Sequence, residues 1–199
     1  AILFIKKVIK SFNIPVVIIS HDIADILKLT PNILLINKGK VEAKGKFLDL
    51  LMQGYFKGVD FNRSFVNDLK FTVLCKSEAS HYTVSLKDSE LHYALFSPQR
   101  ALTPGEEIHA FLRPGDIAIS LHFVEGISIQ NQIKTEVLDI YYDSNSAFSL
   151  LNVGTGIIAQ TTLDSVSALD LKKGLKVYAL FKSAALVLYD DSMHLSLGI

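Results

Sequence analysis

One stretch of this sequence is present twice, and the repeat narrows the possible folds. Residues 102–120 and residues 171–189 align at a constant offset of 69, and both contain a glycine-marked turn, alternating apolar residues and one cation. The matched residues are Leu102, Gly105, Ile108, Ala110, Arg113, Ile117 and Ile119 in the first copy and Leu171, Gly174, Val177, Ala179, Lys182, Leu186 and Leu188 in the second. The last two thirds of the chain are therefore predicted to be two versions of one small β unit.

Short strands with alternating apolar residues are predicted throughout this region. The predicted strands are 71–74, 81–86, 91–96, 108–112, 117–121, 133–141, 148–153, 156–161, 176–181 and 185–188. About five strands per copy, with turns at Gly or Asp, are typical of a small Greek-key barrel of the OB kind. The early parts of the copies also align, with Asn67 on Asn131 and Val73 on Val137 at an offset of 64. We expect either two barrels or one swapped pair.

The first fifty residues have an α/β pattern instead. Apolar residues at helical spacing predict a helix over 2–12, and the β-branched run Val16–Ser20 predicts a strand buried on both faces of a parallel sheet. A short helical piece over 22–29, a hairpin around Lys38-Gly39 and a helix over 47–52 follow. His21 and Asp22 stand at the carboxyl end of the predicted strand, where ligands gather in such sheets. The alternative is that this pair only caps the next helix.

Composition excludes several classes of function. Lys and Arg balance Asp and Glu, and the region after residue 50 is net acidic, so we expect no nucleic-acid partner. The six histidines are scattered and Cys75 is the only cysteine, so no metal site and no internal disulfide are expected. The acid pair Glu106-Glu107 is predicted to be a solvated face. The apolar runs are far too short to span a membrane.

The order of parts in residues 1–53 resembles the end of an ABC-transporter ATPase domain, around its switch histidine. The resemblance is carried by I-P-V-V-I-I-S-H-D at 14–22 and by the glycine-marked hairpin after it, and it departs from the family at 24–25 and 29–32. It implies that His21 contacts the γ-phosphate of ATP in the full protein, that Asp22 helps to place the loop, and that ATP and Mg²⁺ are used there.

The phosphate-binding motif of such ATPases is not in this sequence. No G-x-x-x-x-G-K-[ST] stretch occurs in the 199 residues. The N-terminus has no initiator Met and begins within the predicted helix, which favours a fragment whose missing ATPase parts lie upstream. We expect that the chain alone does not hydrolyse ATP.

Two stretches of the second copy resemble molybdate-binding (Mop, or molbindin-like) domains. They are S-I-Q-N-Q-I at 128–133 and K-S-A-A at 182–185. The whole chain then resembles the C-terminal part of the ATP-binding subunit of a molybdate importer, with a Mop/TOBE domain. The resemblance implies an oxyanion site that two chains of a homodimer share. Its residues would be Ser128, Gln130, Asn131, Lys182, Ser183 and Ala184, with Gln130 standing where the family usually has Arg.

The predicted organisation follows from both resemblances. Residues 1–53 are expected to be the ATPase piece, 54–65 a linker, and 66–199 a doubled OB-like TOBE/Mop regulatory domain with halves of about 66–122 and 127–190. Its ligand would be molybdate or tungstate, and its partners the transmembrane permease subunits at the cytoplasmic face of the cell membrane. Alternatively, it regulates a sugar, iron, sulfate or polyamine importer by protein contacts alone, with Lys182 a solvated lysine. A free-standing oxyanion storage protein is a further alternative.

Overall fold

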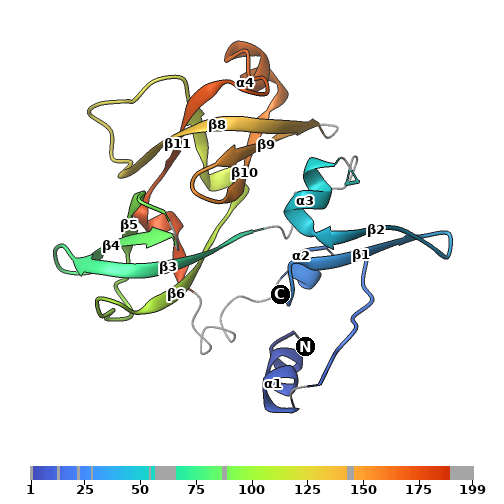
Figure 1. Cartoon of the computed structure of the whole chain (residues 1–199). Coiled ribbons are helices and arrows are strands. Elements are labelled where there is room, and N and C mark those ends of the chain that lie inside the picture. Colours follow the sequence, from blue (N-terminus) through green and yellow to red (C-terminus); the bar gives the residue numbers. More distant parts are fainter. Residues whose placement is uncertain are drawn as a thin grey trace. The chain divides into compact units, whose positions relative to one another are not determined.

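The computed structural model describes residues 2–12, 14–21, 23–27, 29–53, 55–56, 66–86, 89–142 and 146–188. The chain divides into two compact units, residues 1–65 and residues 66–199 (Figure 1). Most of the predicted linker, the residue Asp22 and the last residues of the predicted second half lie outside the described residues. No helix in the described ranges is long and apolar enough to cross a bilayer.

The first unit is built on a β-hairpin. Strand β1 (Asn32–Asn37) pairs antiparallel with β2 (Lys40–Lys46), and the connecting Lys38 and Gly39 have φ angles of +48° and +76°. Two residues with positive φ form the turn whose twist matches a hairpin. Helices α1 (Ile2–Phe12), α2 (Ile23–Leu27) and α3 (Phe47–Met52) complete the unit. The predicted first helix, hairpin and last helix are confirmed.

The predicted buried strand Val16–Ser20 is not present. Residues 14–20 have no regular secondary structure, and the side chains of Val17 and Ile19 are 89% and 91% exposed. A strand of a parallel sheet needs neighbouring strands to satisfy its backbone and helices to cover its faces. In the described part of this unit, β1 and β2 pair only with each other. The prediction of a buried strand is therefore wrong for this chain.

The second unit consists of two five-stranded antiparallel sheets (Figure 1). Their strands are β3 (Asn67–Lys76), β4 (His81–Leu86), β5 (His92–Phe96), β6 (Glu107–Leu112), β7 (Ala118–Ser120), β8 (Asn131–Tyr142), β9 (Ser146–Asn152), β10 (Gly156–Thr162), β11 (Lys176–Phe181) and β12 (Val187–Leu188). All the predicted strands of this unit are confirmed, with bounds that differ by a few residues. The short helices η1 (Pro114–Asp116), α4 (Leu163–Ala168) and η2 (Ser183–Ala185) were not predicted.

The two copies exchange their last strands. One sheet has the order β12-β6-β3-β4-β5 and the other the equivalent order β7-β11-β8-β9-β10, so β7 of the first copy completes the sheet of the second and β12 completes that of the first. The exchanged strands pair in the same register. Ala110 pairs with Leu188, and the equivalent residues of the repeat, Ala179 and Ile119, also pair. Of the two predicted arrangements, the swapped pair is the one that forms.

A single apolar core joins the copies. The inward-facing residues of both sheets belong to one cluster of buried side chains, which includes Ile117 and Leu186, the residues that directly precede the exchanged strands. Burying apolar surface stabilises the fold by roughly 25 cal/mol per Å². Because the cluster is shared, neither copy has a complete core of its own.

Two buried asparagines connect the sheets at their edges. The amide of Asn67 on β3 donates to the carbonyl of Ile158 on β10 at 2.9 Å and accepts from the Ile158 N–H at 2.7 Å. The amide of Asn131 on β8 makes the same pair of bonds with Ala94 on β5, at 2.9 and 2.7 Å. Each asparagine thus satisfies the edge strand of the other copy as a neighbouring strand would.

Candidate functional site

The two stretches that carry the predicted oxyanion site meet at one end of the sheet β10-β9-β8-β11-β7. Strands β8 and β11 are antiparallel neighbours, and Phe181 at the end of β11 pairs with Asn131 at the start of β8. The segment that leads into β8 therefore lies beside η2, which follows β11 directly. Residues more than fifty positions apart in the sequence are brought together by this pairing.

One hydrogen bond fixes the junction. The backbone N–H of Ser183 donates to Oε1 of Gln130 at 3.0 Å. Ser183 itself is buried, while Ser128, Gln130, Lys182 and Ala184 are exposed. The backbone of Lys182 is extended, with φ −69° and ψ 150°, and η2 begins directly after it. The first turn of a helix presents N–H groups that have no partner inside the helix.

Lys182 is the cation of this junction. It forms no ion pair with any residue in the described ranges, and it is exposed. An ammonium group, a hydroxyl and peptide N–H groups can each donate a hydrogen bond to an anion, and the chain carries all three kinds of donor in the two stretches that meet here.

Asn131 has a different position from the other candidates. It is 2% exposed, and its amide is engaged with the backbone of Ala94. The structure therefore shows a role for Asn131 in joining the two copies. Its predicted contact with an oxyanion stays a prediction.

The segment before β8 is held by a residue that the sequence analysis did not single out. The amide of Gln132 accepts from the N–H of Val124 at 2.9 Å and donates to its carbonyl at 2.8 Å. This pair of bonds fixes the loop that carries Ser128. The sequence shows Gln132 only as a glutamine within the 128–133 stretch. Nothing in the sequence indicates that its side chain binds the backbone of Val124, eight residues earlier.

The equivalent place in the first copy lacks the glutamine side chain and the serine N–H of this bond. At an offset of 64, Val66 takes the place of Gln130, and at an offset of 69, Arg113-Pro114-Gly115 takes the place of Lys182-Ser183-Ala184. Val66 has no polar side chain, and Pro114 has no N–H to donate. Only the second copy can form the glutamine bond.

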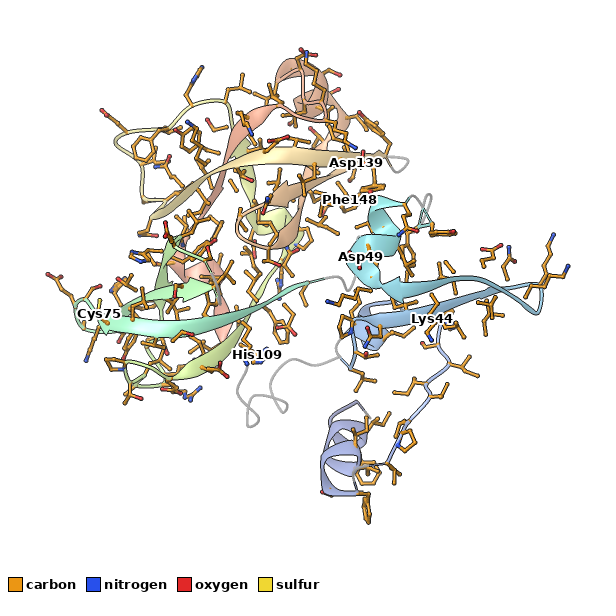
Figure 2. All side chains as sticks on the ribbon, in the orientation of Figure 1. Lys44, Asp49, Cys75, His109, Asp139 and Phe148 are labelled. Carbon is orange, nitrogen blue, oxygen red and sulfur yellow. The ribbon has the colours of Figure 1, made fainter. Side chains whose placement is uncertain are left out.

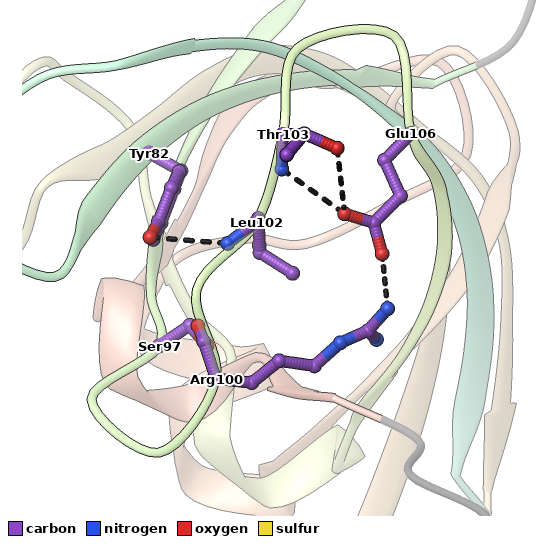
Figure 3. A network of polar contacts seen from close by, with 6 residues as sticks. All are labelled: Tyr82, Ser97, Arg100, Leu102, Thr103 and Glu106. Carbon is purple, nitrogen blue, oxygen red and sulfur yellow. Dashed lines mark hydrogen bonds and ion pairs between the residues drawn. The ribbon is translucent and has the colours of Figure 1, made fainter.

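A second polar cluster lies in the first copy and is structural (Figure 3). The carboxylate of Glu106 is paired with the Arg100 guanidinium and accepts from the N–H and hydroxyl of Thr103 at 3.0 and 3.3 Å. It closes the turn between β5 and β6, where the second copy has α4. Because these contacts engage the carboxylate of Glu106, its role is to hold the turn.

Two other sequence features lie apart from any cluster. His21 is exposed and lies in a bend after residues 14–20, which have no regular secondary structure, and Asp22 lies outside the described residues. Cys75 is exposed near the tip of the β3–β4 hairpin (Figure 2). Among the residues that the structure describes, no three His, Cys, Asp or Glu side chains gather in a way that could hold a metal ion.

Known proteins match both the sequence and the fold. Residues 127–188 match the TOBE domain family. The chain is 27% identical over 187 residues to the molybdenum import ATP-binding protein ModC of Rhizobium etli, and 26% identical over 196 residues to ModC of Hahella chejuensis. Each match covers 92% of this chain and 51% of the relative, so the chain spans about half the length of the curated relatives it matches.

A solved structure has the same fold. The cytoplasmic molybdate-binding protein ModG, crystallised with molybdate bound, is similar with a TM-score of 0.53 and 22% identity, over 61% of this chain and 94% of the ModG chain. With the TOBE match, this likeness confirms the predicted all-β, OB-like module.

Proposed function

From the confirmed resemblance to the C-terminal part of ModC and the TOBE domain at residues 127–188, we propose that this chain is the C-terminal region of the ATP-binding subunit of a molybdate or tungstate importer. Its doubled β module binds the oxyanion and joins two such subunits. One observation supports the binding role most directly: the motif stretches around Gln130 and Ser183 lie together, and Lys182, next to Ser183 in the chain, forms no ion pair within the described ranges.

The chemistry of the junction suits a tetrahedral dianion. An anion that leaves water without a metal needs several hydrogen-bond donors to replace its hydration. Lys182 supplies the charge, the Ser128 hydroxyl and the peptide N–H of Ala184 supply neutral donors, and the absence of bulk at Ala184 leaves room for the ligand. All three residues are exposed, so a second chain is expected to complete the enclosure.

The ATPase role belongs to the full protein. There His21 would contact the γ-phosphate of ATP, with Asp22 placing the loop and Mg²⁺ neutralising the phosphates. Oxyanion held between two modules would favour one arrangement of the dimer over another and so reduce transport. The permease subunits at the cytoplasmic face of the membrane are the expected partners of that dimer.

Calorimetry with molybdate, tungstate and sulfate tests the proposal. We expect molybdate and tungstate to bind, and Lys182→Ala to weaken binding by about tenfold, because a charge-assisted hydrogen bond contributes roughly 1.5 kcal/mol. Lys173→Ala is the matched control, since Lys173 is exposed on the same copy, away from the junction, and forms no ion pair among the described residues. No heat with any oxyanion would contradict the proposal and favour a module that regulates another importer by protein contacts alone.

Sedimentation of the same chain tests the partner. A homodimer is expected, and molybdate should shift the monomer–dimer equilibrium toward the dimer if two chains share the site. A chain that binds molybdate as a monomer, with no shift at any protein concentration, would place the whole site within one chain.

A further inference from the structure

The Gln130–Ser183 bond occupies the peptide N–H next to that of Ala184, and both N–H groups belong to the stretch of the proposed oxyanion site. Ser183 N–H is one of the donors at the start of η2, and the carbonyl oxygen Oε1 of Gln130 occupies it at 3.0 Å. A carbonyl oxygen carries partial negative charge and accepts, as an oxyanion oxygen does. The two acceptors compete for the same N–H.

The fold does not require this bond. The first copy has the same strand order, the same exchanged strand and the same short helix after β6, and it forms them with Val66 and Pro114 at the equivalent positions. These residues can neither accept nor donate in that way. Since one copy folds without the contact, the contact in the other is available for a different role.

A change of rotamer would release the side chain of Gln130 from Ser183. This side chain is exposed, and its only hydrogen bond in the described part of the chain is the one to Ser183. Its neighbour Asn131 is buried and held by Ala94, so the backbone at the start of β8 stays fixed when the glutamine side chain turns.

We infer that Gln130 is an internal competitor that closes the oxyanion site in the absence of ligand and must release Ser183 N–H before the anion binds. The inference rests on the proposed function and adds the regulation of that same site. It differs from the simple expectation that Gln130 is a ligand, because removal of a competitor strengthens binding and removal of a ligand weakens it.

Calorimetry with molybdate and tungstate on the unaltered chain and three variants separates these cases. Gln130→Ala should bind about fivefold more tightly than the unaltered chain, the factor that corresponds to one neutral hydrogen bond. Gln130→Glu should bind more weakly, because its carboxylate holds Ser183 N–H more strongly and repels the anion. Gln99→Ala is the control, since Gln99 is exposed and has no hydrogen bond among the described residues.

Hydrogen exchange of the Ser183 amide gives a second, independent measurement. Its exchange should be slow in the unaltered chain, faster in Gln130→Ala, and slow again in that variant when molybdate is added. A thermal midpoint of Gln130→Ala close to that of Gln99→Ala would show that the fold is retained.

The outcomes are distinct. If the unaltered chain binds molybdate and Gln130→Ala binds it equally or more weakly, the competitor role is overturned and the proposed function stands. If none of the chains binds, both are overturned. Tighter binding by Gln130→Ala, or binding by that variant alone, supports the competitor.

Discussion

The two copies of the β module differ at their junctions far more than in their frames. Both have the same strand order, and both have an irregular register in the first strand, between Val73 and Cys75 in one and between Val137 and Asp139 in the other. Gly105 and Gly174 each have φ +85° and donate to the carbonyl of Val73 or Val137 at 2.8 Å. Such φ angles favour glycine, which explains why the repeat keeps it.

Two of the connections differ in kind between the copies. The first copy crosses to the other sheet through Arg113-Pro114-Gly115 and closes its β5–β6 turn with the Arg100–Glu106 pair, whereas the second crosses through Lys182-Ser183-Ala184 and has helix α4. We therefore assign the shared frame to folding, and the junction of the second copy, with its Gln130–Ser183 bond, to the proposed binding. The following changes test that division.

The largest effect is expected where the copies share the core. Ile117→Ala and Leu186→Ala each remove a side chain that is 2% exposed, and each should lower the free energy of unfolding by about 3 kcal/mol through lost burial and the cavity left behind. Denaturant unfolding of the full chain measures both. Similar losses support equivalent roles. A loss below about 1 kcal/mol at one site would show that its crossing is not part of the core.

The asparagine bridges come next. Asn67→Ala should cost about 2 to 3 kcal/mol and Asn131→Ala about 2 kcal/mol, because each leaves buried backbone groups unsatisfied and Asn67 also donates to the carbonyl of Leu112 at 3.0 Å. Asn152→Ala is the control, since Asn152 lies at the exposed end of β9 and its side chain accepts only from the N–H of Gly154 at 3.3 Å among the described residues. If both bridge variants unfold at the control's denaturant midpoint, the bridges do not hold the copies together.

Changes in the two connections between the third and fourth strands should lower the free energy of unfolding by about the same amount. The two losses should differ in their dependence on salt. Glu106→Ala removes the ion pair, and Thr162→Ala removes the hydroxyl that accepts from Ser165 N–H at 3.1 Å at the start of α4. Each should cost about 1 kcal/mol. Added salt should reduce the cost of the first change alone, because salt screens charges and leaves a neutral cap unaffected. Equal salt dependence would contradict the assignment.

The smallest effect is confined to high pH. Burial, with the Asp139 carboxylate second, raises the pKa of Tyr141 in the second copy to about 12, and burial also raises the pKa of Tyr93 in the first. The folded chain then keeps a proton that the unfolded chain loses above pH 10, so stability falls as the pH rises from about 10 to 12. Tyr141→Phe should flatten this fall between pH 9.5 and 11.5. An unchanged slope would exclude Tyr141 as its source.

The sequence predicts the frame well because alternation is a local property. Residues close together in the sequence determine whether a segment forms a strand or a hairpin. The bounds of β4, β11 and α3 accordingly agree with the predicted ones. The exchange was predicted only as one of two possibilities, since the apolar pattern of β12 is the same whichever sheet it joins. Val16–Ser20 was misassigned because a buried strand depends on partners that its own residues do not specify.

The candidate site could be predicted only in part. The resemblance of residues 128–133 and 182–185 to one family placed them together, and the β8–β11 pairing agrees with that. The contact between Gln130 and Ser183 could not be foreseen, because it depends on a side-chain rotamer and on the start of a short helix. Asn131 was predicted as a site residue from its place in the 128–133 stretch, and nothing in that stretch indicated its hydrogen bonds to the backbone of Ala94.

The exchanged strands also set the timing of assembly on the ribosome. Strand β6 ends at Leu112, and its outer neighbour β12 ends at Leu188, so the first sheet cannot be finished until nearly the whole module has been translated. At about 5–20 residues per second, this delay is roughly 4 to 15 s. Throughout it the backbone of β6 is an open edge that another nascent chain could pair with. Slowly translated or truncated messages should therefore yield aggregated product in place of a folded half.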